Sequence, residues 1–360
     1  MNNVISFPYI GSYYIPIRYI IKKITKCEVI ISSLNNDKTV AIGSKYSPND
    51  ICMPFKYILG NNIYALVKGA NILIYAGCGC QYGYFAKLQE KILEDLGYNF
   101  IFVNLIKNNH ISIKKFYQFA KSINSKLNFL LFVYYIIQGF LIVFFMDELD
   151  KYKRTHQALA INKEVFNVQK NRLIKEYSKE DLSIKKTIKI YLKYRKIYKL
   201  ITTNEKIKPI KILLIGDTFS LIDSDASNNL ENKLLDKGII VYRYTDLTYL
   251  LLKKKLMQQK VLSPAKKYIK YRLGVNGTES IAHTIEHCKK GIDGIIHIKS
   301  YGCVQELNAI PILSKVCEDY KVPIIFLSHD GRNDITNIDT KLEVFYEMIK
   351  QKKIKKKIQK

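Results

Sequence analysis

Apolar residues in the first hundred positions follow two alternating patterns. Short uninterrupted runs predict buried strands, whereas apolar residues spaced three and four apart predict amphipathic helices. The predicted helices lie at residues 15–24, 55–67 and 84–96. The predicted strands lie at residues 28–32, 39–42, 71–76 and 99–105. Because strands that alternate with helices are typical of parallel βαβ units, we expect an N-terminal α/β domain over residues 1–106.

The middle of the chain, residues 107–208, has no clear strand pattern. It contains an uncharged apolar run at 127–146 and then a Lys-rich amphipathic stretch, which together predict a helical insert or subdomain. The run is about long enough to span a bilayer. Gln138 and Gly139 interrupt it, so a buried helix that closes a domain is the favoured interpretation and a membrane span the alternative.

A second alternating pattern begins near residue 209 and predicts a C-terminal α/β domain over residues 209–360, ending in a Lys-rich tail. The expected strands and helices are listed in chain order: strands at 210–215, 238–244, 294–299 and 323–328, and helices at 281–290, 304–320 and 340–349. The predicted fold class is therefore α/β, with two parallel-sheet domains and a helical insert between them.

Charge and cysteine content narrow the function classes. The 58 Lys and Arg residues against 31 Asp and Glu give a net charge of +27, which suits nucleic acid or an anionic membrane. Lysine is spread along the chain, however, and no helix-turn-helix, RNP or zinc-finger pattern accompanies it, so no nucleic-acid partner is expected. With an odd number of cysteines, seven, and no signal-peptide pattern, a cytoplasmic protein with reduced thiols is expected.

Three cysteines occupy one kind of position. Cys52, Cys80 and Cys303 each lie between an expected strand and the start of an expected helix, with glycines beside Cys80 and Cys303. Ligands bind at this edge of parallel sheets, and helix amino ends favour anions and lower thiol pKa values. Soft thiolates select iron–sulfur clusters or zinc. The alternative, a small buried hydrophobe, is the expected state of the cysteines at 27, 288 and 317.

The histidines are weaker candidates. His283 and His287 are spaced for one helix face with Glu286 between them, which suits zinc, but the order is not H-E-x-x-H and no third ligand is evident. His329 ends an expected strand at the ligand edge, whereas His297 is expected to pack within its strand. The loop at 215–218 carries one glycine and is expected to line a crevice. No P-loop and no G-x-S-x-G elbow occurs.

Motifs around these cysteines give the chain a family resemblance. Residues 7–16, F-P-Y-I-G-S-Y-Y-I-P, look like the opening F-P-x-x-G-x-x-Y-I-P of the 2-hydroxyacyl-CoA dehydratase superfamily. Residues 77–84, G-C-G-C-Q-Y-G-Y, are similar to its G-C-G-P-C-R-F-G-Y-Y. Further similar segments are C-M-P-F-K at 52–56, G-T-E-S at 277–280 and C-V-Q-E at 303–306. The chain most resembles the single-chain members related to the acyl-CoA dehydratase activase.

The resemblance implies two flavodoxin-like domains that hold a [4Fe-4S] cluster, with a double-cubane cluster as the second candidate. Its implied ligands are Cys52, Cys80 and Cys303. It also implies a separate ATP-dependent iron–sulfur activase that delivers a low-potential electron for radical dehydration or reduction of a substrate, with an acyl-CoA as the candidate substrate. A homodimer or heterodimer is expected, and no membrane partner.

Three departures from the family pattern matter. The shortened C-G-C leaves Cys78 and Cys80 as alternatives for one ligand, and Gln81 replaces the family's Arg. Residues 330–336, D-G-R-N-D-I-T, differ from its D-E-x-T-G-E-A. Two hypotheses therefore stand: an active lyase or reductase component with its own substrate, and a catalytically silent cluster-binding partner or assembly protein of the same fold.

Overall fold

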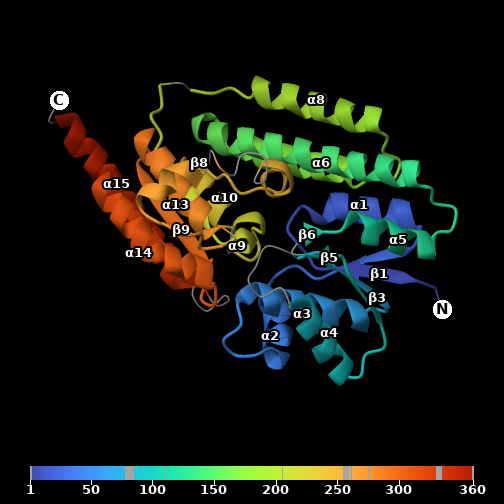
Figure 1. Cartoon of the computed structure of the whole chain (residues 1–360). Helices are drawn as coiled ribbons and strands as arrows, with labels where there is room; N and C mark the ends of the chain where they lie inside the picture. Colours follow the sequence, from blue (N-terminus) through green and yellow to red (C-terminus); the bar gives the residue numbers. More distant parts are fainter. Residues whose placement is uncertain are drawn as a thin grey trace. The chain divides into compact units, whose positions relative to one another are not determined.

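The protein is represented by a computed structural model whose chain divides into two compact units (Figure 1). Unit 1 contains Met1–Met146 and Lys170–Tyr194, and unit 2 contains Asp147–Gln169 and Arg195–Lys360. Each unit has its own four-stranded parallel sheet. The structure describes residues 2–77, 85–108, 110–204, 206–253, 259, 262–274, 276–329 and 335–358.

The sheet of unit 1 has the strand order β2-β1-β3-β4. Its strands are β1 (Val4–Phe7), β2 (Glu28–Ile31), β3 (Ile72–Tyr75) and β4 (Ile101–Asn104). In register, Ile5 of β1 faces Val29 on one side and Ile72 on the other. The sequence pattern did not predict β1, because its apolar run is only four residues long and ends at Pro8. This short strand is nevertheless central to the sheet.

Helices cover both faces of this sheet, as Figure 1 shows. Alternate residues of β1 and β3, such as Ile5 and Ile74, pack with α1, α5 and the start of α6, whereas Leu73 and Tyr75 pack with α3 and α4. This alternation is the period-two pattern of a strand that is buried on both faces. The helices are α1 (Tyr14–Thr25), α2 (Asp37–Tyr46), α3 (Met53–Val67), α4 (Phe85–Asp95) and α5 (Ile113–Ile123).

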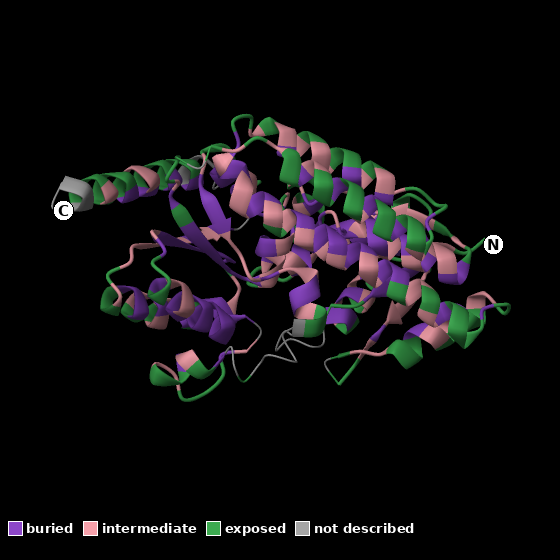
Figure 2. Cartoon of the chain, turned by 90° about the horizontal axis from the view of Figure 1, so that it is seen from above, coloured by how far each residue is buried: buried purple, intermediate pink, exposed green. Residues whose placement is uncertain are grey.

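The sheet of unit 2 has the order β10-β9-β7-β8 and is likewise covered on both faces. One core cluster joins it to α9, α10 and α15, and the other to α13 and α14. Its strands are β7 (Lys211–Gly216), β8 (Ile240–Tyr242), β9 (Gly294–Ser300) and β10 (Ile324–His329). Its helices are α9 (Thr218–Ile222), α10 (Leu230–Asp236), η2 (Tyr249–Lys253), η3 (Ser263–Lys267), α13 (Gly277–Lys289), α14 (Val304–Asp319) and α15 (Ile335–Ile358). Figure 2 colours residues by burial, and β7, β8 and β9 are almost entirely buried.

Both sheets place their strands in the same order. The first strand has the second on one side and the third and fourth on the other, in each unit. The chain therefore reverses its winding direction between the first and third strands, which are β1 and β3 in unit 1 and β7 and β9 in unit 2. In open parallel sheets the crevice at the carboxyl ends of two such strands is the usual ligand site.

The prediction of a strand at residues 39–42 is wrong, because these residues lie inside α2. Asn36 caps this helix by accepting the Thr39 amide at 3.1 Å, and Asp37 lies in its first turn. The reason for the helix is also tertiary. A Cβ at Gly43 would lie 1.8 Å from the Lys56 carbonyl oxygen of α3, and one at Gly60 would lie 2.1 Å from that of Thr39. These glycines let α2 and α3 pack backbone to backbone.

The middle of the chain is helical as expected, and it contributes to both units. Its helices are α6 (Phe129–His156), η1 (Gln157–Leu159), α7 (Glu164–Tyr177) and α8 (Ile184–Leu200). A short antiparallel pair, β5 (Ile106–Lys107) and β6 (His110–Ile111), precedes them and was not predicted. Within unit 1, Phe132 of α6 is fully buried and lies edge-on to Phe116 of α5.

Candidate functional site

Cys303 lies where the sequence placed it, between β9 and α14. It is the N-cap residue of α14, and its side chain makes no capping hydrogen bond. The thiol is partly buried and donates to Gln305 Oε1 at 3.8 Å. Since β9 borders the reversal of winding in unit 2, Cys303 lies at the edge where a parallel sheet binds ligands.

A buried polar cluster holds the neighbouring loop after β7. Asp217 caps α9 by accepting the Ser220 amide at 2.9 Å, and its Oδ2 accepts the Ser300 amide at 2.8 Å. The Ser220 hydroxyl lies 2.7 Å from both Asp217 Oδ2 and His329 Nε2. The cluster thus connects the ends of β7, β9 and β10. Gly216 permits this approach, because its φ is +144° and a Cβ would lie 1.7 Å from the Ile298 carbonyl oxygen.

The order of these groups argues against a serine nucleophile. In a catalytic triad the histidine lies between the serine and the acid, so that it removes the serine proton. Here Ser220 lies between Asp217 and His329, and its single proton is donated to the carboxylate. With Asp217, Ser220 and His329 all at most 7% exposed, the cluster instead fixes the carboxyl edge of the sheet.

A second buried set fixes α14 itself. His297 Nε2 lies 2.8 Å from Glu306 Oε2, and both residues are at most 1% exposed. The Ser280 hydroxyl of α13 donates to the same carboxylate at 3.2 Å, and the Tyr244 hydroxyl lies 3.3 Å from Ser280. His297 therefore packs within its strand, as expected. Because Glu306 is in the first turn of α14, the pair also fixes the start of the helix that Cys303 caps.

Lys299 places a cation beside this site. Its side chain comes from β9 and is only 3% exposed. Burial lowers the pKa of Lys299, while the negative forms of Cys303, Asp217 and Glu306 act in the opposite direction. A thiolate at Cys303 would therefore have a nearby positive charge as well as a helix amino end. Sequence reasoning missed Lys299, since one lysine among many carries no signal of burial.

Cys52 is also a helix N-cap, but the element before it differs from the prediction. It caps α3, with Pro54 in the first turn and no side-chain capping bond, and it is partly buried. The strand expected before Cys52 is in fact the helix α2, so Cys52 lies in the connection between two helices. Four residues separate the end of α3 from the start of β3. The amino end of α3 therefore lies on the carboxyl side of the sheet of unit 1.

Neutral groups hold the loop after β1 in unit 1. Asn61 of α3, fully buried, accepts the Tyr9 amide at 2.6 Å and donates to Asn35 Oδ1 and to the Ser33 carbonyl oxygen, each at 3.2 Å. Asn35 in turn donates to the Tyr9 carbonyl oxygen at 3.2 Å. The Ser32 hydroxyl donates to the carbonyl oxygen at the end of β1. Amides and hydroxyls therefore hold the loop after the first strand in unit 1, as Asp217 and His329 hold the corresponding loop in unit 2.

Several other predicted site residues lie outside the described residues. Cys78, Cys80 and Gln81 fall in residues 78–84, and Asp330 falls in residues 330–334, neither of which is described. In chain order, residues 78–84 follow β3 and precede α4. Among the described cysteines, Cys52 belongs to unit 1 and Cys303 to unit 2.

The remaining cysteines match the expected structural role in part. Cys288 of α13 and Cys317 of α14 are buried in the core of unit 2. Cys317 donates to Cys288, and this bond together with burial raises the pKa of Cys317, which keeps its thiol protonated. Cys27 is only partly buried, just before β2. None of the three lies at a helix amino end.

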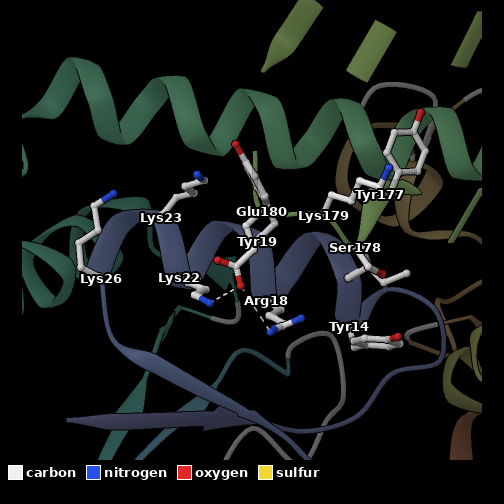
Figure 3. Close-up of a pocket in the computed structure, with 11 residues that line it drawn as sticks. Tyr14, Arg18, Tyr19, Lys22, Lys23, Lys26, Tyr177, Ser178, Lys179 and Glu180 are labelled. Carbon is white, nitrogen blue, oxygen red and sulfur yellow. Dashed lines mark hydrogen bonds and ion pairs between the residues drawn. The ribbon is translucent and has the colours of Figure 1, made fainter. Parts of the chain in front are cut away.

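A basic pocket of about 210 Å³ lies along α1 in unit 1 (Figure 3). Arg18, Lys22 and Lys26 follow one another at four-residue spacing, and Lys179 adds a further cation. Among the described residues of the lining, Glu180 is the single carboxylate, and it forms ion pairs with Lys22 and, at 3.9 Å, with Arg18. The lining therefore attracts anions. In the sequence, the i, i+4 spacing of Arg18 and Lys22 was the signal that could have indicated this basic pocket.

One helical segment among the described residues, Phe129–Leu159, is long and apolar enough to cross a membrane by length and composition. In the most apolar 18-residue stretch of this segment only 39% of the residues are buried, and Leu130 is 81% exposed. Core helices meet the same criterion, so a single segment of this kind is weak evidence for a span.

Comparison with protein-family models finds no model that matches the chain, and comparison with curated proteins finds no match either.

Proposed function

We propose that the chain is an iron–sulfur protein of the type found in the 2-hydroxyacyl-CoA dehydratase superfamily. In this proposal both units are flavodoxin-like domains, and Cys52, Cys303 and Cys80 are the ligands of a [4Fe-4S] cluster, with Cys78 as the substitute for Cys80. An ATP-dependent activase supplies the electron for radical dehydration or reduction of a substrate.

The observation that carries the proposal is the position of the cysteines relative to the shared strand order. Cys303 follows β9, the third strand of its sheet, and residues 78–84, which contain Cys78 and Cys80, follow β3, the third strand of the other. Both strands, β3 and β9, border the reversal of winding, and such sheets bind ligands at the carboxyl ends of these strands. The strand order, second-first-third-fourth, is that of the first four strands of flavodoxin-like sheets.

The donors fit an anionic cluster. Cys52 and Cys303 are N-cap residues without side-chain capping bonds, so their sulfur atoms lie at the positive ends of two helices. Lys299 adds a buried cation near Cys303. Thiolates are the usual ligands of iron–sulfur clusters. A cluster with three protein thiolates supplies one-electron transfer and an iron with an open position for a substrate oxygen.

The protein's own residues would hold this site rigid. Asp217, Ser220 and His329 fix the loop after β7, and the pair of His297 and Glu306 fixes the first turn of α14. Ligands held by packed, hydrogen-bonded neighbours keep their geometry when charge changes. This preorganisation suits a centre that changes oxidation state.

Anaerobic reconstitution with iron and sulfide, followed by chemical analysis of both, tests the proposal. Cys52→Ala and Cys303→Ala are each expected to lose most of the cluster and its visible absorption. The matched control is Cys27→Ala, another partly buried thiol, which should retain the cluster. Comparing Cys78→Ala with Cys80→Ala identifies the third ligand. Full cluster content in both the Cys52 and the Cys303 variants would overturn the proposal.

A further inference from the structure

One turn of α13 brings together three groups that the proposed cluster does not use. His283, Glu286 and His287 each offer one donor atom, and the three atoms lie within 4.8 Å of one another. His283 is 7% exposed, and the other two are partly buried. The turn belongs to unit 2, and its histidine rings face Tyr242 and Tyr244 at the end of β8 and just after it.

Hydrogen bonds orient both imidazoles. His287 Nδ1 lies 2.9 Å from the His283 carbonyl oxygen, which can only accept, so Nδ1 carries the proton and Nε2 keeps its lone pair. His283 Nδ1 lies 3.3 Å from Glu286 Oε2. Metal-bound histidines usually donate their second N–H to a carbonyl or carboxylate, as His287 does here. The His283 ring is also stacked on Tyr244, with centroids 3.9 Å apart and an interplanar angle of 18°.

His283 offers its Nδ1 to the same cluster. The 3.3 Å between this nitrogen and Glu286 Oε2 is a separation at which both atoms can bind one ion. With a metal ion on Nδ1, the proton of His283 lies on Nε2, which is buried and has no hydrogen-bond partner among the described residues.

The chemistry of the three donors selects the ligand class. Two imidazoles and one carboxylate are the protein donors of several zinc sites that keep an open fourth position. Residues 283–287 read H-T-I-E-H, and in the H-x-x-E-H order of one class of zinc enzymes the two histidines of the helix bind the metal. Here the third donor comes from the geometry, because a Glu286 carboxylate oxygen lies within 4.8 Å of the histidine donor atoms.

We propose that His283, Glu286 and His287 form a binding site for a divalent transition-metal ion of the zinc type. The ion pair of Glu286 with Lys290 is solvent-exposed, with side chains 43% and 64% exposed, and therefore opposes metal binding only weakly. The site is separate in composition from the cysteine ligands, and it would exist whether or not the chain binds a cluster.

Titration of the full-length chain with Co²⁺, followed by displacement with Zn²⁺, tests the site. We expect one tight equivalent with weak visible bands, without the intense near-ultraviolet absorption of cobalt bound to thiolates. His283→Asn and His287→Asn should each weaken binding by tenfold or more, and Glu286→Gln by several-fold. These replacements are polar and no larger than the originals, and circular dichroism reports whether the fold persists.

His110→Ala is the matched control, because it removes an exposed histidine of the short strand β6 in unit 1. It should bind Co²⁺ as the wild type does. Wild-type affinity in both histidine variants, or a cobalt spectrum dominated by thiolate bands, would overturn the proposal. If a histidine variant loses its fold, zinc-dependent protection of the wild-type residues 277–289 from hydrogen exchange serves as the second measurement, and absence of protection counts against the site.

Discussion

In unit 1 the loop after the first strand is held by neutral amides and hydroxyls, whereas in unit 2 the equivalent loop is held by a carboxylate and a histidine. Asn61 and Asn35 form the hydrogen bonds that hold this loop in unit 1, and Asp217 and His329 form those that hold it in unit 2. Unit 2 also buries Lys299 and Glu306 near this edge. The same strand order therefore supports two electrostatic environments. Only in unit 2 do ionisable groups hold the loop, so only there does the energy of these contacts depend strongly on the charge of a neighbouring group.

The largest effect is expected from Glu306→Ala. Removing this carboxylate leaves His297 and Ser280 buried without their partner, and breaking a buried pair in this way typically costs about 3–5 kcal/mol of unfolding free energy. Urea denaturation measures the change. Glu318→Ala, on the same helix with a side chain 73% exposed, should stay within about 0.5 kcal/mol of the wild type. Equal effects of the two substitutions would mean that the buried network of unit 2 is not a stabilising feature.

Asn61→Ala tests the neutral network of unit 1. It leaves the Tyr9 amide and the Ser33 carbonyl oxygen without their partner, at about 1–3 kcal/mol for each buried group left unpaired. A total near 3 kcal/mol is expected, and it should be the same at pH 6 and pH 8, because no charge is involved. The exposed Asn49→Ala is the control. A pH-dependent loss would contradict the neutral character of this edge.

Lys299→Met sharpens the contrast through pH. Burial lowers the pKa of Lys299 below 10.5, so between the lowered value and 10.5 the unfolded chain binds a proton that the native state has released. Wild-type stability gains from this group as pH rises through that window, and the Met variant has no such gain. The stability difference should therefore shift in favour of the wild type between pH 7 and pH 10. A difference that stays constant over this range would show that the ammonium is not desolvated.

Glu180→Gln is expected to have the smallest effect. Glu180 is the only carboxylate that the described part of the chain places in the basic pocket, and the hydrogen bond from Lys22 holds the pKa of Glu180 below its usual value. Its loss leaves the cations of α1 unpaired and should lower the melting temperature slightly at low salt. At 1 M salt, where the screening length is about 3 Å, the difference should vanish. A difference that persists at high salt would indicate a role other than surface charge.

Much of the candidate site follows from local sequence. Cys52 and Cys303 are placed at helix starts by the apolar spacing that follows them, and His297 by the apolar run around it. These are short-range signals, because the apolar spacing within and beside an element indicates its type. The long-range partners carry no such signal. Nothing near Ser220 in the sequence indicates that His329, more than a hundred residues away, would lie 2.7 Å from its hydroxyl.

Apolar periodicity was enough to predict the α/β class, the helical middle segment and the position of most strands, because it records which faces are buried. The remaining features depend on contacts between residues far apart in the chain. Residues 39–42 have the composition of a strand, yet they form a helix because Gly43 and Gly60 allow α2 and α3 to approach closely. Packing therefore decides together with the Asn36 cap, since the free energy of burial depends on the neighbours that each residue finds.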